Sequence, residues 1–268
     1  MNEEKIKVAV AGASGRMGST IISLLNKCPD MQLAWAFEAK GHTSIGKEVL
    51  PGIKISDGFE NAPQSVDVLI DFTSPEATLI NIEHAKKKKT KLVIGTTGFS
   101  QEQMITIKDA ANHIPLIISP NMSIGVNIMM EIVESATRML GDDYEVEIIE
   151  THHHNKKDAP SGTALKIGEI VNRVRNRKDR EGFVYGRQGK PGPRTKDEIG
   201  IHSVRISEII GEHSVLFGGT GEILEITHKC FSRESFASGA ISATRFIYSK
   251  SQGFYEMKDV IDWLRKSR

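Results

Sequence analysis

Residues 6–18 read IKVAVAGASGRMG, and this stretch decides the fold of the first half of the chain. Ile6–Ala11 is a short apolar run typical of a buried strand, and Arg16–Asn26 carries apolar side chains at helical spacing. Between them, Gly12–Gly18 has the spacing GxxGxxG, with Ser14 where the middle glycine of a GxGxxG loop usually stands. Glycines at these places let the backbone turn tightly and bring a helix N-terminus up to an anion. A plain strand-to-helix turn would explain the same spacing.

An acidic residue after the next strand extends the motif. The expected strand Leu33–Phe37 is followed by Glu38, which lies 20 residues beyond Gly18 (38 − 18). An acid at this place accepts hydrogen bonds from the ribose hydroxyls of an adenine dinucleotide. Together these features predict dinucleotide binding, although Glu38 could also be an ordinary strand-end acid. The next residue offers no charge to a 2′-phosphate, whereas Lys40 or Arg16 could reach it, so the sequence predicts use of NADH with NADPH tolerated.

Strands and helices alternate up to Ile118, which is typical of an α/β fold with a Rossmann-type parallel sheet covered by helices on both faces. Further strands are expected at Val66–Phe72, Lys91–Ile94 and Leu116–Ile118, and helices from Pro75 to about Lys88 and at Gln101–Asn112. Beyond Pro120 the pattern becomes α+β. Helices are expected at Ile124–Leu140 and Ser161–Val174, strands at Glu145–Thr151, Gly200–Ile206, His213–Phe217 and Ile223–Lys229, a long loop at Asn176–Glu198, and final helices at Glu234–Tyr248 and Met257–Leu264.

These patterns predict two domains. Residues 1–123 form a dinucleotide-binding domain, which the C-terminal helices in 233–268 complete, and residues 124–232 form a second, α+β domain.

The 268 residues carry a net charge of only +1, so neither a nucleic-acid nor a membrane partner is expected. The basic run Lys86–Lys89 is interpreted as a solvated helix end. Cys28 and Cys230 form no metal-binding or disulfide pattern, and the charged start shows no leader, so a reducing, cytoplasmic location is expected.

Two loops follow expected strands of the first domain. They are Gly95-Thr96-Thr97-Gly98 and Ser119-Pro120-Asn121-Met122. Ligands of open α/β sheets bind at the carboxyl ends of the strands, so both loops could line the nicotinamide end of the cofactor. Either could instead be a plain turn.

The most unusual segment is ETHHHNKKDAPSGT, residues 150–163. Histidine transfers protons near neutral pH, Lys156 adds positive charge, and Ser161 could cap a helix whose first N–H groups favour a carboxylate. The segment is therefore interpreted as an anion-binding, proton-donating site. A solvated loop is the alternative; a metal site is not predicted, because consecutive histidines on a strand point to opposite faces.

The chain resembles the 4-hydroxy-tetrahydrodipicolinate reductase (dihydrodipicolinate reductase) family along essentially its whole length. The matching stretches are Val10–Gly18, Gly95–Phe99, Asn121–Asn127, Glu147–Leu165, Glu225–His228 and Ser232-Arg233. This resemblance implies an NAD(P)H-dependent reduction of a cyclic dicarboxylate in lysine and diaminopimelate biosynthesis. It also implies that the second domain binds substrate and builds a homotetramer through its sheet.

The resemblance further implies roles for individual residues. Cofactor contacts would come from Gly12, Ala13, Ser14, Gly15, Arg16, Met17, Glu38, Gly95, Thr96, Thr97, Ser119, Pro120, Asn121 and Met122. His152 would donate or accept a proton, Lys156 would donate one, and His153, Gly162 and Thr163 would bind substrate carboxylates. Some members carry arginine where this chain has Ala39, which leaves the choice between NADH and NADPH open.

Two rival functions differ in class. Another amino-acid-pathway dehydrogenase would need a catalytic cysteine or different motifs in the second domain, and neither Cys28 nor Cys230 has a nucleophile's setting. A nucleotide-sensing Rossmann protein without catalysis would have a degraded histidine-lysine segment, and here that segment is intact.

Overall fold

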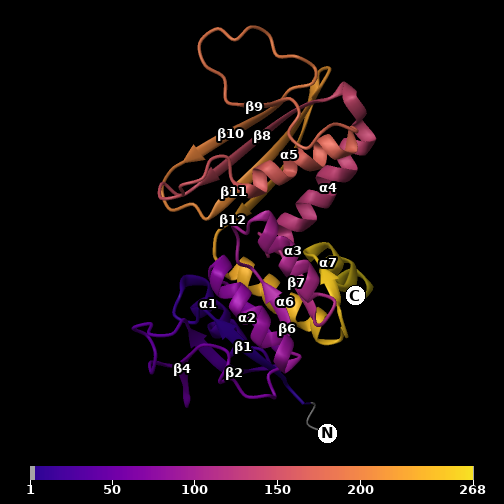
Figure 1. Cartoon of the computed structure of the whole chain (residues 1–268). Helices are drawn as coiled ribbons and strands as arrows, with labels where there is room; N and C mark the ends of the chain where they lie inside the picture. The colour runs from indigo at the N-terminus through magenta and orange to yellow at the C-terminus, as the bar shows by residue number, and fades with distance from the viewer. Residues whose placement is uncertain (1–3, 268) are drawn as a thin grey trace. The chain divides into compact units, whose positions relative to one another are not determined.

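The computed structural model describes residues 4–267, and the chain divides into two compact units (Figure 1). The first unit runs to Ile124 and resumes at Arg233, and the second spans Gly125–Ser232. The last two helices therefore pack in the first unit, although the second unit precedes them in the chain. Within residues 4–267, no helix is long and apolar enough to cross a membrane.

The first unit is built on an eight-stranded sheet in the order β13-β7-β6-β5-β1-β2-β4-β3. Its strands are β1 (Ile6–Ala11), β2 (Met31–Glu38), β3 (Glu48–Leu50), β4 (Ile53–Asp57), β5 (Val68–Asp71), β6 (Lys91–Ile94), β7 (Pro115–Ile118) and β13 (Gly253–Tyr255). All pairings are parallel except that of β3 with β4. The chain leaves β1 first toward β2 and later toward β5, so the strand order reverses between β1 and β5. This is the topology of the predicted Rossmann-type fold, whose ligands bind at that reversal.

Helices cover both faces of this sheet. They are α1 (Arg16–Leu25), α2 (Pro75–Lys88), α3 (Gln101–Ala110), α6 (Glu234–Tyr248) and α7 (Met257–Lys266). Because side chains alternate along a strand, Val8 and Val10 of β1 join one apolar cluster while Ala9 and Ala11 join the other. The first cluster contains residues of α1, α6 and α7, and the second contains residues of α2 and α3. Burial on both faces explains the continuous apolar strands of the sequence.

The second unit is a five-stranded sheet with helices on one face. Its elements are α4 (Ile124–Leu140, whose first residue belongs to the first unit), a 3₁₀ turn at Gly141–Asp143, β8 (Glu145–His152), α5 (Gly162–Val174), β9 (Phe183–Tyr185), β10 (Ile199–Arg205), β11 (Gly211–Gly219) and β12 (Glu222–Cys230). The sheet order is β12-β11-β8-β10-β9. Val146 and Ile148 of β8 face the core formed with α4 and α5. Ile149, the next residue along the strand, is exposed on the other face.

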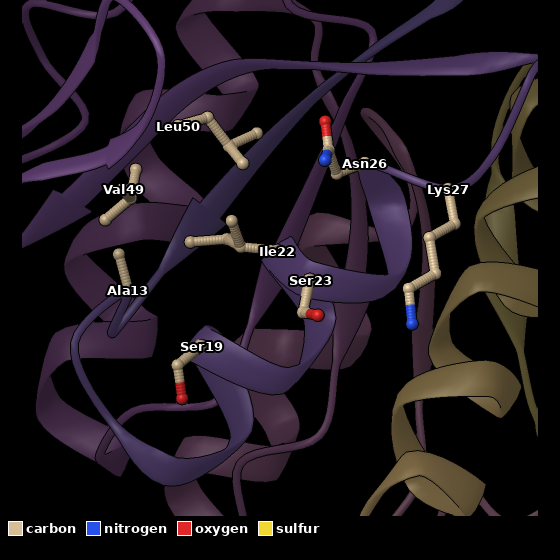
Figure 2. A pocket seen from close by; sticks show the side chains of 8 residues that line it. All are labelled: Ala13, Ser19, Ile22, Ser23, Asn26, Lys27, Val49 and Leu50. Carbon is tan, nitrogen blue, oxygen red and sulfur yellow. The ribbon is translucent and has the colours of Figure 1, made fainter.

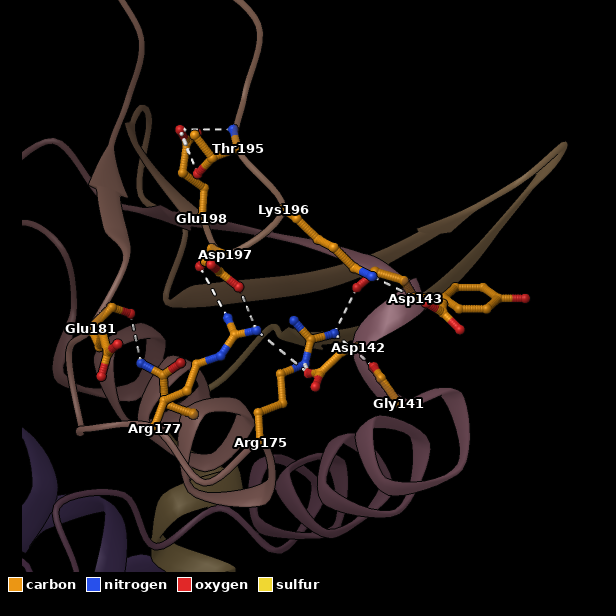
Figure 3. Close-up of polar contacts among 12 residues, drawn as sticks. Gly141, Asp142, Asp143, Arg175, Arg177, Glu181, Thr195, Lys196, Asp197 and Glu198 are labelled. Atoms are coloured by element: carbon orange, nitrogen blue, oxygen red, sulfur yellow. Dashed lines mark hydrogen bonds and ion pairs between the residues drawn. The ribbon is translucent and has the colours of Figure 1, made fainter.

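The segment expected to be one long loop, Asn176–Glu198, contains β9, so that expectation was wrong in part. The strand has only three residues and pairs in parallel with β10, a contact that local sequence does not reveal. One ion pair joins the two ends of the segment to each other, and another joins its second end to the 3₁₀ turn (Figure 3). Arg177 lies 2.8 Å from Asp197, and Lys196 lies 3.2 Å from Asp143. Strands β3, β4 and β13 were likewise not predicted; each has five residues or fewer.

Candidate active site

The glycine loop is shaped by close backbone contacts. Gly12 has a φ of +65°, and a Cβ there would lie 3.0 Å from the Phe72 carbonyl oxygen. A Cβ at Gly18 would collide with the Gly12 carbonyl oxygen. The first glycine therefore allows the turn at the end of β1, and the last lets α1 pack directly against it, which are the roles expected of such a loop.

Helix α1 begins at this loop without a side-chain cap. Gly15 occupies the N-cap position and has no side chain that could accept a hydrogen bond from the first turn. The first turn holds no acidic residue. Ser14, Gly15 and Arg16 are exposed. The first N–H groups of a helix lack partners within the helix, so this uncapped start, with a cationic residue beside it, suits a pyrophosphate. The residues present fit a dinucleotide.

Glu38 lies at the carboxyl end of β2 and reaches the same loop. Its Oε1 accepts hydrogen bonds from the Ser14 backbone N–H at 2.8 Å and from the Ser14 hydroxyl at 2.6 Å. Serine at the middle-glycine position thus has a structural reason, because its hydroxyl anchors the acid beside the loop. The half-buried carboxylate retains oxygen lone pairs for ribose hydroxyls.

A buried polar network joins the loops that follow β5 and β6. Asp71, at the end of β5, is fully buried and accepts hydrogen bonds from Thr73 Oγ1 at 2.6 Å and from Asn81 Nδ2 at 2.9 Å. Thr96 Oγ1 lies 3.3 Å from the same carboxylate and accepts the Thr73 backbone N–H at 2.9 Å. Burial raises the pKa of Asp71, and these hydrogen bonds oppose that rise. The network fixes Thr96 within the predicted nicotinamide loop, while Thr97 is left exposed.

The loop after β7 is ordered by its own side chains. Ser119 Oγ donates to the Asn121 carbonyl oxygen at 2.8 Å, and the Ser123 backbone N–H donates to Asn121 Oδ1 at 3.0 Å. Met122 is only 1% exposed and packs into the core, as does Ala13. Since both side chains face the interior, contacts of these two residues with a cofactor would use the backbone.

Because β1, β2, β6 and β7 are parallel strands of one sheet, the predicted cofactor residues all lie at its carboxyl edge. A hollow of about 300 Å³ on this unit borders the glycine loop at Ala13 (Figure 2). Its apolar lining comes from Ala13, Ile22, Val49 and Leu50, and its polar lining from Ser19, Ser23, Asn26 and Lys27. Of the predicted cofactor residues it contains only Ala13, so the other predicted contacts lie outside this hollow.

In the second unit, His152 is the last residue of β8 and is held by a buried carboxylate. Its Nδ1 lies 2.5 Å from Glu150 Oε2, and Glu150 is fully buried. Arg205, at the end of β10, donates to both carboxylate oxygens at 2.8 and 2.7 Å. Burial alone would raise the pKa of Glu150, but the bonds from His152 and Arg205 hold it well below its usual range.

The start of α5 adjoins this group. Ser161 caps the helix, as predicted, by accepting the Ala164 backbone N–H at 3.2 Å, and its own N–H donates to Glu150 at 3.1 Å. The same hydroxyl lies 3.1 Å from Nε2 of the buried His213. Gly162 is exposed, and a Cβ there would meet nothing within 4 Å. The helix start therefore has room for an anion.

The remaining predicted residues lie in the loop between β8 and α5. Lys156 is half-buried and pairs with Asp158 at 2.9 Å, and His153 is half-buried. His154 is exposed, and its Nδ1 lies 2.8 Å from the Ser207 carbonyl oxygen. Of the three histidines only His152 lies in the strand, so the argument from opposite strand faces does not apply to the others. Among the described residues, no group of histidine, cysteine and acidic side chains could hold a metal ion.

The sequence alone indicated no individual role for several members of these networks, chiefly Asp71, Glu150, Arg205 and His213. One signal was available for Glu150: it shares the period-2 face of Val146, Ile148 and His152, so an acid stood on the buried side of an apolar strand.

Comparison with known proteins gives a consistent family. The family model described as "Dihydrodipicolinate reductase, N-terminus" matches residues 6–122, and "Dihydrodipicolinate reductase, C-terminus" matches residues 125–261. A 4-hydroxy-tetrahydrodipicolinate reductase of Nitrosospira multiformis is 43% identical over 96% of this chain and 97% of its own. One of Geotalea daltonii is 43% identical over 96% and 98%. The solved dipicolinate-bound dihydrodipicolinate reductase of Paenisporosarcina sp. TG-14 aligns with a TM-score of 0.76 at 28% identity, covering 94% of this chain and 98% of that one.

The Rossmann sheet, its uncapped glycine loop and these relatives define a reductase that uses a nicotinamide cofactor. The chain belongs to the dihydrodipicolinate reductase family.

The burial of His213 makes stability depend on pH. Burial, and then the nearby His152, lowers the pKa of His213 from 6.5 to about 3. The unfolded chain therefore takes up this proton at a higher pH than the folded chain does, so stability is lost as pH falls from about 6.5 toward 3. For this residue we expect a loss of about 2 kcal/mol of unfolding free energy between roughly pH 7 and pH 5.

Urea unfolding at the two pH values measures this loss. His213→Asn should flatten the dependence, whereas His154→Asn, which changes an exposed histidine of the same unit, should leave it unchanged. Equal slopes for the parent and His213→Asn would contradict the assignment.

Proposed function

We propose that the chain reduces (2S,4S)-4-hydroxy-2,3,4,5-tetrahydrodipicolinate with NAD(P)H to (S)-2,3,4,5-tetrahydrodipicolinate and water, in lysine and diaminopimelate biosynthesis. The observation that carries this proposal is the group formed by His152, Glu150 and the open start of α5, in a chain of this family. It combines a proton-transferring side chain with an anion-binding helix start, and this reaction needs both.

The first unit is proposed to bind the cofactor. Gly12–Met17 would receive the pyrophosphate, Glu38 the adenosine ribose, and Gly95–Thr97 with Ser119–Met122 the nicotinamide end. When bound, the nicotinamide would supply a hydride. The uncapped α1 start and the Ser14–Glu38 hydrogen bonds support the first two assignments. The Asp71 network supports the assignment of Gly95–Thr97, because it holds Thr96 in place before any ligand arrives.

The second unit is proposed to bind the dicarboxylate and to move the proton. Lys156 and the backbone N–H groups of Gly162 and Thr163 would hold one carboxylate by charge and by the helix dipole, and His153 would assist. His152 would transfer a proton at Nε2, because Nδ1 is engaged by Glu150. Lys156 would serve as a second proton donor, and its partner Asp158 keeps its side chain in place.

Two structural observations weigh against the rival functions. A dehydrogenase with a cysteine nucleophile needs an accessible thiol, whereas Cys230 is buried and Cys28 donates to the Leu24 carbonyl oxygen at 3.4 Å. A nucleotide sensor without catalysis has no use for a buried Glu150–His152 pair two residues apart on one strand.

The second unit is also proposed to build a homotetramer through its sheet, in the cytoplasm. The sheet face opposite α4 and α5 exposes large apolar side chains, including Ile149 at 38%, Val204 at 40% and Ile223 at 67%. Large apolar side chains exposed on a sheet face can belong to an interface between subunits. Two free cysteines accord with a reducing compartment.

The activity is tested by the loss of reduced-nicotinamide absorbance with freshly prepared hydroxy-tetrahydrodipicolinate. We expect turnover that depends on this substrate. His152→Ala should lower turnover by about 10²–10⁴-fold, the usual contribution of general acid catalysis, with cofactor affinity unchanged. His154→Ala removes the exposed neighbouring histidine and should retain turnover. Parent-like turnover in His152→Ala would remove this residue from the proton transfer.

Cofactor choice is tested at Glu38. Glu38→Ala should raise KM for NADH more than KM for NADPH, because only NADH presents a 2′-hydroxyl to the carboxylate. Steady-state kinetics with both cofactors measure the effect. An equal rise for the two, or no rise for NADH, would exclude Glu38 as the ribose ligand.

The assembly is tested at the exposed sheet face. Ile223→Asp should shift the sedimentation of the protein from a tetramer toward smaller species, because a charge would be buried at the interface. Ile105→Asp is the matched control, since Ile105 is 69% exposed on α3 of the first unit. A tetramer that survives Ile223→Asp, or a parent that sediments as a monomer, would refute this interface.

A further inference from the structure

Glu150 is more constrained than an ordinary strand residue. It is fully buried, two residues before His152, and both side chains lie on the core-facing side of β8. A carboxylate removed from water needs donors from the protein to remain charged. The donors around Glu150 therefore decide what it can do.

Both oxygens of this carboxylate accept hydrogen bonds. Oε1 receives Arg205 Nη2 at 2.7 Å and the Ser161 backbone N–H at 3.1 Å. Oε2 receives Arg205 Nη1 at 2.8 Å and lies 2.5 Å from His152 Nδ1. The two-pronged contact with Arg205 fixes the plane of the carboxylate, and the Ser161 N–H fixes its position along β8.

This arrangement determines where the histidine ring carries its proton. An ionised carboxylate can only accept hydrogen bonds, so His152 Nδ1 must be the donor. When the ring is neutral, Nε2 is then the unprotonated nitrogen, and when it is charged, Nε2 carries the proton that can leave. Gly211 lies beside this nitrogen, and a Cβ there would crowd it at 3.1 Å from Nε2.

We propose that Glu150 is a positioning residue for the reaction: it holds His152 with a proton on Nδ1 in both charge states of the ring, so that Nε2 alone exchanges a proton with the substrate. This inference rests on the proposed function of His152. Arg205 has the supporting role of keeping the carboxylate ionised and oriented.

The same carboxylate also ties the proton donor to the proposed anion site. Its bond to the Ser161 N–H holds the residue that caps α5, directly before Gly162 and Thr163. Arg205 Nη2 also donates to the Asp158 carbonyl oxygen at 2.7 Å, which anchors the loop that carries Lys156. A change at Glu150 should therefore disturb the proton transfer first and carboxylate binding second.

The charged surroundings favour this role. Two titratable side chains touch the Glu150–His152 pair: Arg205 from β10 bonds the carboxylate, and the His213 ring from β11 lies against the His152 ring. His228 from β12 and Lys156 act in turn on His213, and Asp158 pairs with Lys156. Burial lowers the pKa of His213 and of His228, so it disfavours a positive charge on either ring. Glu150 is thus the carboxylate in direct contact with the His152 ring.

The first test needs no substrate. Nitrogen-15 spectra of the histidine-labelled full-length chain, recorded where the rings are neutral, show which ring nitrogen bears the proton, and the His152 signals are those absent from His152→Gln. We expect the Nδ1–H form, although free histidine favours Nε2–H. An Nε2–H form in the parent protein would overturn the proposal.

The second test is kinetic. In Glu150→Gln the side-chain amide can turn its NH₂ group toward His152 and favour the wrong tautomer, as an amide does when it replaces the acid beside a catalytic histidine. We expect kcat to fall by about 10²-fold or more, with KM for the cofactor unchanged. In the nitrogen-15 spectrum of this variant, His152 should lose its preference for the Nδ1–H form, which a loss of packing alone would not cause.

Glu134→Gln is the matched control. Glu134 is a carboxylate of the same unit that pairs with Arg138 and Arg173, each at 3.0 Å, and it lies on α4. It should leave kcat and the His152 nitrogen-15 signals unchanged. A Glu150→Gln variant with parent-like kcat and parent-like His152 signals would overturn the proposal. If that variant does not fold, the parent's spectrum decides. If the parent lacks turnover, the proposed function fails while the tautomer result still stands by itself.

Discussion

The carboxylate of Glu150 is buried on the core side of β8, where water cannot solvate it, and the site in the second unit is organised around that constraint. Arg205, Ser161 and His152 each satisfy part of its hydrogen-bonding capacity. Through these three residues, one buried charge links β10, the start of α5 and the end of β8. The site is therefore largely formed by the fold itself, and a ligand would meet groups whose positions are already set.

In the first unit, buried or half-buried carboxylates order the loops that would bind the cofactor. The ligand edge of this unit consists of loops, which are mobile unless something orders them. Asp71 orders the loops after β5 and β6 by accepting hydrogen bonds from Thr73 and Thr96. Glu38 orders the glycine loop by accepting a hydrogen bond from the Ser14 backbone N–H. In both units, carboxylates held by short side-chain contacts fix the segments that carry the proposed binding groups.

The sequence predicted those parts of the fold that depend on local pattern. The spacing of Gly12–Gly18, the acid at Glu38 and the alternation of apolar segments each reflect neighbouring residues, and they led to the Rossmann-type sheet that the structure has. Strand β9 was missed because its three residues are held by pairing with β10 and have too little pattern of their own. Long-range partners were missed for the same reason. Arg205 meets Glu150 across 55 residues, and only the parallel register of β8 and β10 brings them together.

The reaction proposed for this chain transfers a hydride from the nicotinamide to the ring of a cyclic dicarboxylate. The most direct measurement uses a cofactor deuterated at the transferable position of nicotinamide C4, with hydroxy-tetrahydrodipicolinate as substrate and mass spectrometry of the product. We expect tetrahydrodipicolinate that carries one deuterium from the cofactor. Product without deuterium, or oxidation of the cofactor without this product, would contradict it.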